Sequence, residues 1–358
     1  MRRILRCLII IITGCAMALP ALAQKGPDSE LVPDKIESKK SAYSGWVPTL
    51  SLGASVQFSH SSNVVGAQDG ETWNIGPLLD FSIGYYSAEH EWRNTLSIRE
   101  VLTRTPAVGE FVKTTDQLKF ESLYLYKPSA APWVGPFLMA QVNTPIFRTT
   151  DVRAAPAVYE TRDKNGVTVE TTIPTTKKRL TGWFAPLNLK ESAGAFFTAA
   201  NIPEAKLEFR MGVGARQVFT GNGNAIASQD ETIDPSALPN VPANTTLVKL
   251  NRLFDYQQLG GELFAGLNGT ITFEDLGPTR PILYSLSTEV LMPFYSSEQQ
   301  DRALLELTNV NIEAKVAIKL LSWLSLDYAL RAVRDPLLLD EFQIQNTLLL
   351  NMSYALLK

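Results

Sequence analysis

QIQNTLLLNMSYAL, residues 343–356, is the stretch that decides the fold. Apolar side chains occupy every second position from Leu348 to Leu356, and polar residues such as Asn351 lie between them. A period of two with one apolar and one polar face indicates a half-buried β-strand. When such strands recur in an exported chain, the apolar face can contact lipid instead of a protein core.

The start of the chain has the pattern of a secretory signal peptide. Three arginines precede a short apolar run, and the sequence ALA ends at Ala23. These are the basic region, the apolar region and the small-residue cleavage site of an export signal, so we expect residues 1–23 to be removed. The alternative is lipidation of Cys15 in place of cleavage after Ala23, because Ile-Thr-Gly precedes that cysteine.

The composition excludes several classes of function. Cleavage changes the balance of basic and acidic residues from 33 against 36 to 30 against 36, a net charge of −6. A mildly acidic chain gives no reason to expect nucleic acid as a partner. Cleavage also removes both cysteines, which excludes disulfides, thiolate metal sites and a cysteine nucleophile. We expect no metal and no cofactor.

The alternation of apolar and polar residues recurs along most of the chain. Residues 24–45 are polar and charged, and we expect them to form a flexible periplasmic lead-in. No later segment has the roughly 18 consecutive apolar residues of a transmembrane helix. Strands are predicted near residues 48–60, 72–86, 91–104, 113–127, 132–146, 182–199, 205–219, 253–269, 281–294, 304–320, 323–334 and 341–357.

Each predicted strand is long enough to cross a bilayer at a tilt, which takes roughly 9–11 residues. We therefore predict an all-β protein: one antiparallel up-and-down transmembrane β-barrel of about twelve strands over residues 46–358. The six tryptophans fall near predicted strand ends, where aromatic girdles of membrane proteins lie. A soluble barrel is the alternative, which alternation by itself does not reject.

The links between predicted strands alternate in length. Short links follow the even-numbered strands, and the two longest, residues 145–181 and 220–252, follow odd-numbered ones. Short periplasmic turns and long outer loops are typical of outer-membrane barrels. Inside the first long link, the sequence DKNG at residues 163–166 predicts a hairpin, because it lies between two short β-prone segments.

If lipid contacts the apolar faces, the polar faces line the lumen. The two signs of charge on these faces are nearly balanced, which favours internal ion pairs over a pore with one sign in excess. A track for a substrate is the alternative, and twelve strands leave room for a narrow or plugged pore. The candidate lumen residues are Asp80, Arg93, Arg99, Lys119, Glu121, Glu208, Arg210, Arg216, Glu262, Glu289, Glu313, Lys315, Lys319, Asp327 and Arg331.

Groups for catalysis are scarce, because the chain has two histidines. His60 lies where the first predicted strand meets its outer loop, and His90 lies in a tight turn. Barrel-shaped lipid hydrolases use a histidine with a serine and an acid or amide, so His60 with a nearby serine or Asp69 is the catalytic candidate. The sequence does not place these groups at a fixed spacing.

Four short motifs mark the first quarter of the predicted barrel: Ser62-Asn63, Gly70 with Trp73, EWRN at residues 91–94 and KTTD at residues 113–116. With these motifs, residues 46–127 resemble an uncharacterised family of Gram-negative outer-membrane proteins of unknown function. The resemblance implies a barrel in the outer membrane and brings no activity or ligand with it. For such a barrel we expect membrane lipid and the barrel-assembly machinery as partners, with a small solute as a further candidate. Bacterial barrels usually end on an aromatic residue that this machinery reads, whereas this chain ends in YALLK.

Three functions remain open from the sequence. The first is a narrow passive pore or transporter for an unidentified small solute in the outer membrane of a Gram-negative bacterium. The second is a surface interaction protein that acts through residues 145–181 and 220–252, since long loops often carry function. The third is a lipid-modifying enzyme that uses His60.

Overall fold

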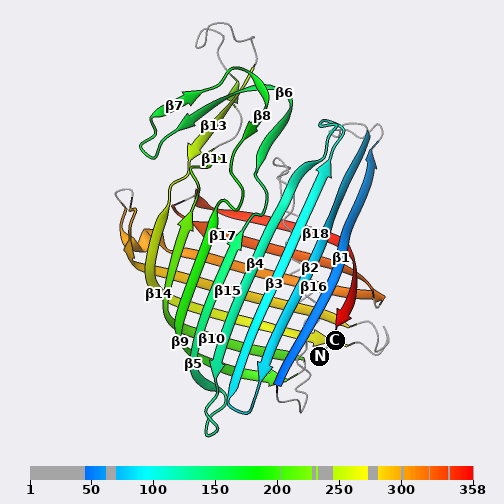
Figure 1. The fold of residues 1–358 in the computed structure, drawn as a ribbon, viewed down its shortest axis with the longest axis vertical. Helices are drawn as coiled ribbons and strands as arrows, with labels where there is room; N and C mark the ends of the chain where they lie inside the picture. Colours follow the sequence, from blue (N-terminus) through cyan, green and yellow to red (C-terminus); the bar gives the residue numbers. More distant parts are fainter. Residues whose placement is uncertain are drawn as a thin grey trace, which may run out of the picture.

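The computed structural model describes residues 45–61, 70–202, 204–227, 231–232, 245–272, 281–299, 302–321, 323–337 and 339–357. Residues 1–44, with the predicted signal peptide and nearly all of the predicted lead-in, lie outside this set. The described chain folds into a closed barrel with a smaller sheet at one end (Figure 1). In this part of the chain, no helix is long and apolar enough to cross a membrane.

The barrel contains twelve strands within the described residues, and they match the twelve predicted segments. Neighbouring strands in the barrel pair antiparallel, and the last strand closes the barrel against the first. The predicted fold class is therefore confirmed. The barrel strands are β1 (Gly45–Ser61), β2 (Gly70–Tyr86), β3 (His90–Arg104), β4 (Val112–Tyr126), β5 (Val134–Thr144), β9 (Leu187–Ile202), β10 (Ala205–Phe219), β14 (Tyr256–Ile271), β15 (Ile282–Ser296), β16 (Asn309–Leu321), β17 (Leu324–Asp335) and β18 (Leu339–Leu357).

The C-terminal strand β18 shows how the period of two sets the two faces of the wall. Leu348 and Leu350 are 58% and 43% exposed on the outer surface. Asn351, which follows Leu350, is 1% exposed. Its side-chain amide donates a hydrogen bond of 2.8 Å to Asp327 on β17. Successive side chains of a strand point to opposite faces, so the apolar row lies outside and the polar row inside.

The two long links form a single second sheet at one end of the barrel (Figure 1). Its strands are β6 (Thr150–Arg162), β7 (Thr168–Thr171), β8 (Thr175–Arg179), β11 (Asn224–Ile226), β12 (Glu231–Thr232) and β13 (Thr246–Arg252). β13 from the second link pairs in parallel with β6 from the first. The hairpin predicted at residues 163–166 is confirmed, because β6 and β7 flank that turn and pair antiparallel.

Two predicted strands begin later than expected. The segment near residues 304–320 starts with the 3₁₀ helix η2 (Leu304–Leu307), and β16 begins at Asn309. The run LLEL has no period of two, and Leu307 is fully buried against Val218 and Tyr256. The segment near residues 182–199 becomes a strand only at Leu187, because Phe184 has a φ of 51° and breaks the extended backbone.

The wall of the barrel is apolar outside and polar inside, as β10 shows. Met211 and Val213 are 61% and 54% exposed, whereas Glu208 and Arg210 are 7% and 8% exposed. The other exposed apolar side chains of the wall include Leu52, Phe58, Leu138, Leu263, Leu286, Phe294 and Ile344. Proteins that fold in water show the opposite arrangement in their interiors.

Candidate functional site in the barrel lumen

Ion pairs between strands that are not neighbours identify side chains that point into the lumen. Arg93 Nη2 on β3 lies 3.3 Å from Glu208 Oε2 on β10, although β4, β5 and β9 separate these strands in the wall. Arg216 Nη2 on β10 lies 2.6 Å from Asp335 Oδ2 on β17. A contact that skips several strands of a closed barrel has to cross its interior.

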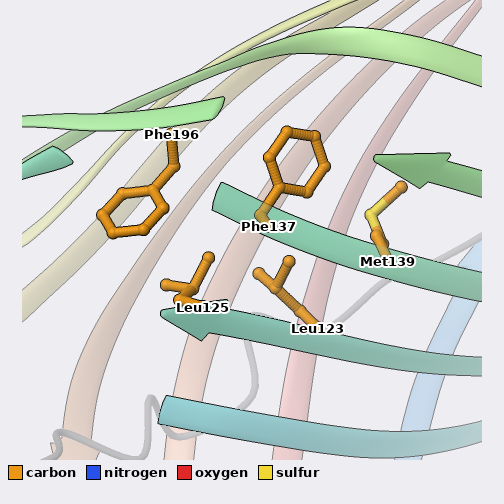
Figure 2. Packing of buried hydrophobic residues seen from close by; sticks show 5 residues of the cluster. All are labelled: Leu123, Leu125, Phe137, Met139 and Phe196. Atoms are coloured by element: carbon orange, nitrogen blue, oxygen red, sulfur yellow. The ribbon is translucent and has the colours of Figure 1, made fainter. Parts of the chain in front are cut away.

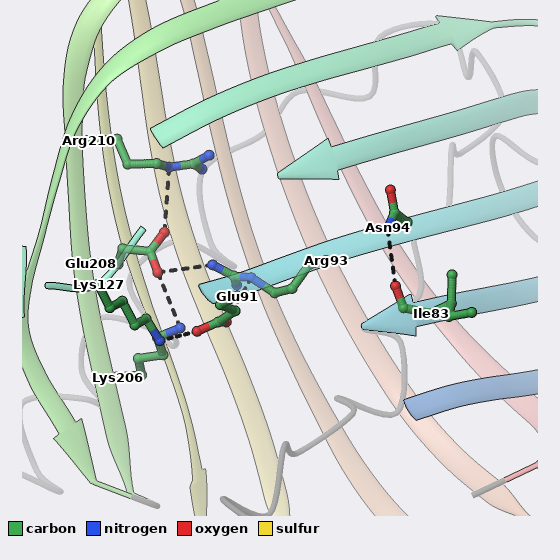
Figure 3. Close-up of polar contacts among 8 residues, drawn as sticks. All are labelled: Ile83, Glu91, Arg93, Asn94, Lys127, Lys206, Glu208 and Arg210. Atoms are coloured by element: carbon green, nitrogen blue, oxygen red, sulfur yellow. Dashed lines mark hydrogen bonds and ion pairs between the residues drawn. The ribbon is translucent and has the colours of Figure 1, made fainter. Parts of the chain in front are cut away.

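One group of crossing contacts, which we call the charged cluster, consists of Glu91, Arg93, Lys127, Lys206, Glu208 and Arg210 (Figure 3). Arg93 Nε lies 3.1 Å from Glu91 Oε1, and Lys127 also pairs with Glu91. Glu208 accepts contacts from Lys206 at 3.2 Å and from Arg210 at 3.5 Å. The cluster lies toward the barrel end with short turns, because β3 and β10 begin there and Lys127 follows β4.

A second group, which we call the apolar cluster, lies beside the charged cluster: Leu123, Leu125, Phe137, Met139 and Phe196 (Figure 2). These residues are at most 5% exposed and come from β4, β5 and β9. Arg93 is the backbone partner of Leu123, and Arg210 is the partner of Phe196. Since cross-strand partners point to the same face, the apolar cluster also faces the lumen. The sequence-based prediction of a polar lumen did not include it.

Lys190 on β9, the backbone partner of Arg216, bridges two carboxylates of other strands. Its Nζ lies 3.1 Å from Glu262 Oε1 on β14 and 2.6 Å from Glu289 Oε1 on β15. Lys190 is 8% exposed and Glu262 is 4% exposed. One cation faces two carboxylates here, so the bridge stabilises both acids and leaves one negative charge in excess.

The outer part of the lumen holds a polar network around Asp335. Its Oδ2 accepts a hydrogen bond of 2.7 Å from the Tyr256 hydroxyl and pairs with Arg216. Arg216 Nη1 donates a bond of 2.6 Å to Asn309 Oδ1, and Asn309 in turn donates to Gln258 at 2.7 Å. In the described part of the chain, polar contacts therefore link non-neighbouring strands of the barrel in three groups.

The remaining predicted lumen residues lie in smaller pairs. Arg99 lies 2.9 Å from Asp80 on the neighbouring strand. Glu313 on β16 contacts Lys315 at 3.7 Å and Arg331 at 3.8 Å. Lys119, Glu121 and Lys319 lie on the same barrel strands, β4 and β16, as residues of these clusters and pairs. A role of any candidate in contacting a solute stays a prediction.

The period of two did not lead to five of the residues in these contacts: Glu91, Lys127, Lys190, Lys206 and Asp335. Glu91 lies two positions before Arg93 and therefore shares its face, so the period of two was a usable signal. Lys127 and Asp335 lie at strand ends, where the alternation stops. Lys190 lies in a stretch where glycine and alanine blur the pattern. The charges that meet across the lumen are far apart in the sequence, so no local pattern brings them together.

The catalytic candidate His60 lies near the end of β1, where its backbone pairs with Glu71. Asp69, its proposed partner, lies outside the described residues. The hypothesis of catalysis by His60 therefore stays a prediction.

The six-stranded sheet has its own buried core. Ala157, Tyr159, Val248 and Leu250 are fully buried and pack together across β6 and β13. The Tyr159 hydroxyl donates a hydrogen bond of 3.0 Å to Asp151 Oδ2. Burial, the nearby Asp151 carboxylate and this bond raise the pKa of Tyr159 to about 12. The two long links are therefore held together by packing and not by chain continuity alone.

No family model and no curated protein matches this chain. Among solved structures, the COG4313 outer membrane channel from Pseudomonas putida F1 is similar at 10% identity and a TM-score of 0.37, covering 91% of this chain and 99% of that one. The beta domain of the Bordetella autotransporter BrkA has 10% identity and a TM-score of 0.32, with 87% and 98% covered. With identities and TM-scores this low, these similarities carry no argument about function.

Proposed function

We propose that the chain is an outer-membrane β-barrel of a Gram-negative bacterium that lets a small solute pass through a narrow lumen. The observation that carries the proposal is the reversed polarity of the wall, with Met211 and Val213 outside and Glu208 and Arg210 inside. An apolar solvent around the barrel accounts for the first pair, and water inside the lumen accounts for the second.

The spacing of aromatic groups along β1 supports a bilayer as that solvent. Trp46 contacts Trp92 and Tyr85 near one end of the wall, with ring centroids 5.7 and 5.3 Å apart. Phe58 contacts Trp73 near the other end, with centroids 4.5 Å apart. Trp46 and Phe58 are twelve residues apart on one strand. At about 3.3 Å per residue and a tilt of about 40°, that spacing spans about 30 Å, the thickness of the hydrocarbon core.

The polar contacts across the lumen support a narrow passage and not a wide one. Ion pairs that cross the interior between β3 and β10 and between β10 and β17 divide the cross-section. Charged groups in such a lumen need water or one another as partners. We therefore expect small, discrete conductance steps when the mature chain is inserted in planar bilayers.

A double variant and a matched control test whether the current passes through this lumen. Replacing both Arg216 and Asp335 by alanine removes the outer crossing, so the step should become larger. The matched control replaces Lys164 and Glu298, an exposed ion pair of 3.1 Å outside the barrel wall, and should leave the step unchanged. Two results would show that solute does not pass by this route. One is the absence of conductance steps from correctly folded protein, and the other is a step of unchanged size in the Arg216 and Asp335 double variant.

The six-stranded sheet favours a second candidate function, a surface interaction. Its strand β7 is exposed along its whole length, and Val167 and Ile173 beside it are 59% and 83% exposed. An exposed strand edge with apolar side chains is suited to pairing with another chain. Loss of binding to a surface partner after deletion of residues 145–181 and 220–252, with the barrel still folded, would support this role.

A third candidate is a lipid-modifying activity that depends on His60. It predicts that His60→Ala abolishes hydrolysis or transfer on lipid substrates, and an unchanged rate would remove it.

A further inference from the structure

The charged cluster contains more cations than carboxylates. Among the described residues, Glu208 is shared by Arg93, Lys206 and Arg210, and Glu91 is shared by Arg93 and Lys127. Four cations thus share two carboxylates. An excess of buried positive charge is unfavourable unless an anion compensates it.

The neighbouring carboxylates remove only part of this excess. Glu262 and Glu289 are held by Lys190 at 3.1 and 2.6 Å. That bridge has two carboxylates for one cation, so its spare negative charge compensates one of the two surplus cations of the charged cluster and leaves one. The charged cluster is therefore the part of the lumen that is suited to receive an anion from outside.

Arg210 is the cation of the cluster with the weakest partners. Its side chain is 7% exposed, and its Nε contacts Glu208 Oε1 only at 3.5 Å, beyond a good hydrogen bond. That Nε is buried without a hydrogen-bond partner in the described part of the chain, and Nη1 donates to the weak acceptor Met139 Sδ at 3.2 Å. A guanidinium offers five donors in a planar fork that suits a carboxylate.

Apolar side chains also lie around Arg210. Its guanidinium lies over the Phe264 ring at 3.8 Å and over the Phe137 ring at 5.8 Å. Phe137 and Met139 belong to the apolar cluster, which continues from there along β4 and β9. A small, strongly hydrated anion would lose its water here without compensation. An anion that carries an apolar group would place that group against these side chains and gain from its burial.

We propose that the charged cluster and the apolar cluster form one binding site for an organic carboxylate with an apolar body. The carboxylate pairs with Arg210, and the apolar body packs against Phe137, Met139 and Phe196. The site rests on the proposed function only for the route by which the ligand enters. If the proposed function is right, organic carboxylates with an apolar body are the class of solute that binds in the lumen during passage.

The test is calorimetric titration of the folded mature chain in detergent with octanoate as the probe. Two related compounds separate the two parts of the site: acetate keeps the charge and lacks the apolar body, and octyltrimethylammonium keeps the chain and reverses the charge. We expect octanoate to bind at one site, acetate to bind about tenfold more weakly or worse, and the cation not to bind. Equal binding of octanoate and the cation would overturn the proposal, because detergent-like partition would explain it.

Two substitutions in the charged cluster should act in opposite directions. Arg210→Gln should weaken octanoate binding by about tenfold or more, because it removes the fork that pairs with the carboxylate. Glu208→Gln should tighten binding by about threefold, because it removes a competing anion beside Arg210. Arg104→Gln, at the exposed end of β3, makes the same chemical change as the first and should have no effect.

Folding of each variant is checked by the shift in gel mobility between unheated and heated samples. A folded Arg210→Gln variant that binds octanoate like the parent would refute the site. The same is true if folded Glu208→Gln binds more weakly.

The titration tests the binding site and the conductance experiment tests the pore, so the failure of one proposal can be told from the failure of the other. Octanoate binding without conductance steps would support the binding site and remove the pore. Steps that persist without octanoate binding would support the pore and remove the binding site.

Discussion

Asp335 illustrates how single residues are held in this lumen. Its carboxylate is 2% exposed and has two partners through Oδ2, the Arg216 guanidinium and the Tyr256 hydroxyl. Charged groups in an interior are stable when paired and hydrogen-bonded, and costly when one partner is missing. The lumen residues predicted from the sequence include Arg216 and omit Asp335, although each of the two charges needs the other as its partner.

Asp335→Ala should destabilise the barrel by about 3–5 kcal/mol, because it leaves the Arg216 charge without its carboxylate. Urea unfolding of the barrel in lipid vesicles measures this free energy. Replacing both residues, Arg216→Met with Asp335→Leu, should recover most of the loss, since no unpaired charge remains. If the double variant is as unstable as Asp335→Ala, the cost comes from lost packing and not from the uncompensated charge.

At the scale of elements, the pairing of β6 with β13 converts two long links into one structured sheet. The strands pair in parallel and belong to links that are separated by β9 and β10 in the chain. Fully buried Val248 and Leu250 pack against Ala157 and Tyr159 across this pairing. The six-stranded sheet is therefore held together by contacts between its own strands, which do not involve the barrel wall.

Val248→Asp should open the six-stranded sheet without unfolding the barrel, because it puts a carboxylate into an apolar core, at a cost of several kcal/mol. Limited proteolysis should then cut near the turn at residues 163–166, while the gel-mobility shift of the barrel stays. Val169→Asp is the matched control, since Val169 is 47% exposed on β7, and its digestion pattern should equal that of the parent. Similar patterns for both variants would mean that β13 does not hold the sheet together.

At the scale of the whole molecule, the barrel reverses the usual distribution of side chains. The exposed surface of the wall is apolar, and the interior holds charged groups together with the smaller apolar cluster. This arrangement is stable only if the solvent around the wall is itself apolar. The aromatic groups near both ends of β1 and β2 mark where that solvent would give way to water.

Val213→Arg tests this statement, because Val213 is 54% exposed on the outside of β10. In a bilayer the charge should cost about 2–4 kcal/mol near the midplane. On a surface in contact with water the same change should lie within about 0.5 kcal/mol. Ser287→Arg, on the inward face of β15 opposite Glu313, is the control and should cost less. The measurement is again urea unfolding in vesicles, and near-zero costs for both variants would rule out lipid around the wall.

Much of the fold was predictable from the sequence, because the period of two is a local property. Residues two apart share a face of a strand whatever the strand packs against. Segments such as 343–356 therefore predicted both a β-strand and the set of side chains on its apolar face. The alternating link lengths then predicted the up-and-down order. Where the local pattern is weak, as in the run LLEL of η2, the prediction of a strand was wrong.

The candidate site was predictable only in part, for a physical reason. The period of two placed Arg93, Glu208 and Arg210 on polar faces, but only barrel closure brings β3 within 3.3 Å of β10. Charges counted along the chain are nearly balanced, whereas the charges that meet at the charged cluster are not. The sequence by itself determined which side chains face inward; the closed barrel decided which of them meet, because contacts across a lumen depend on strand order and register and not on distance along the chain.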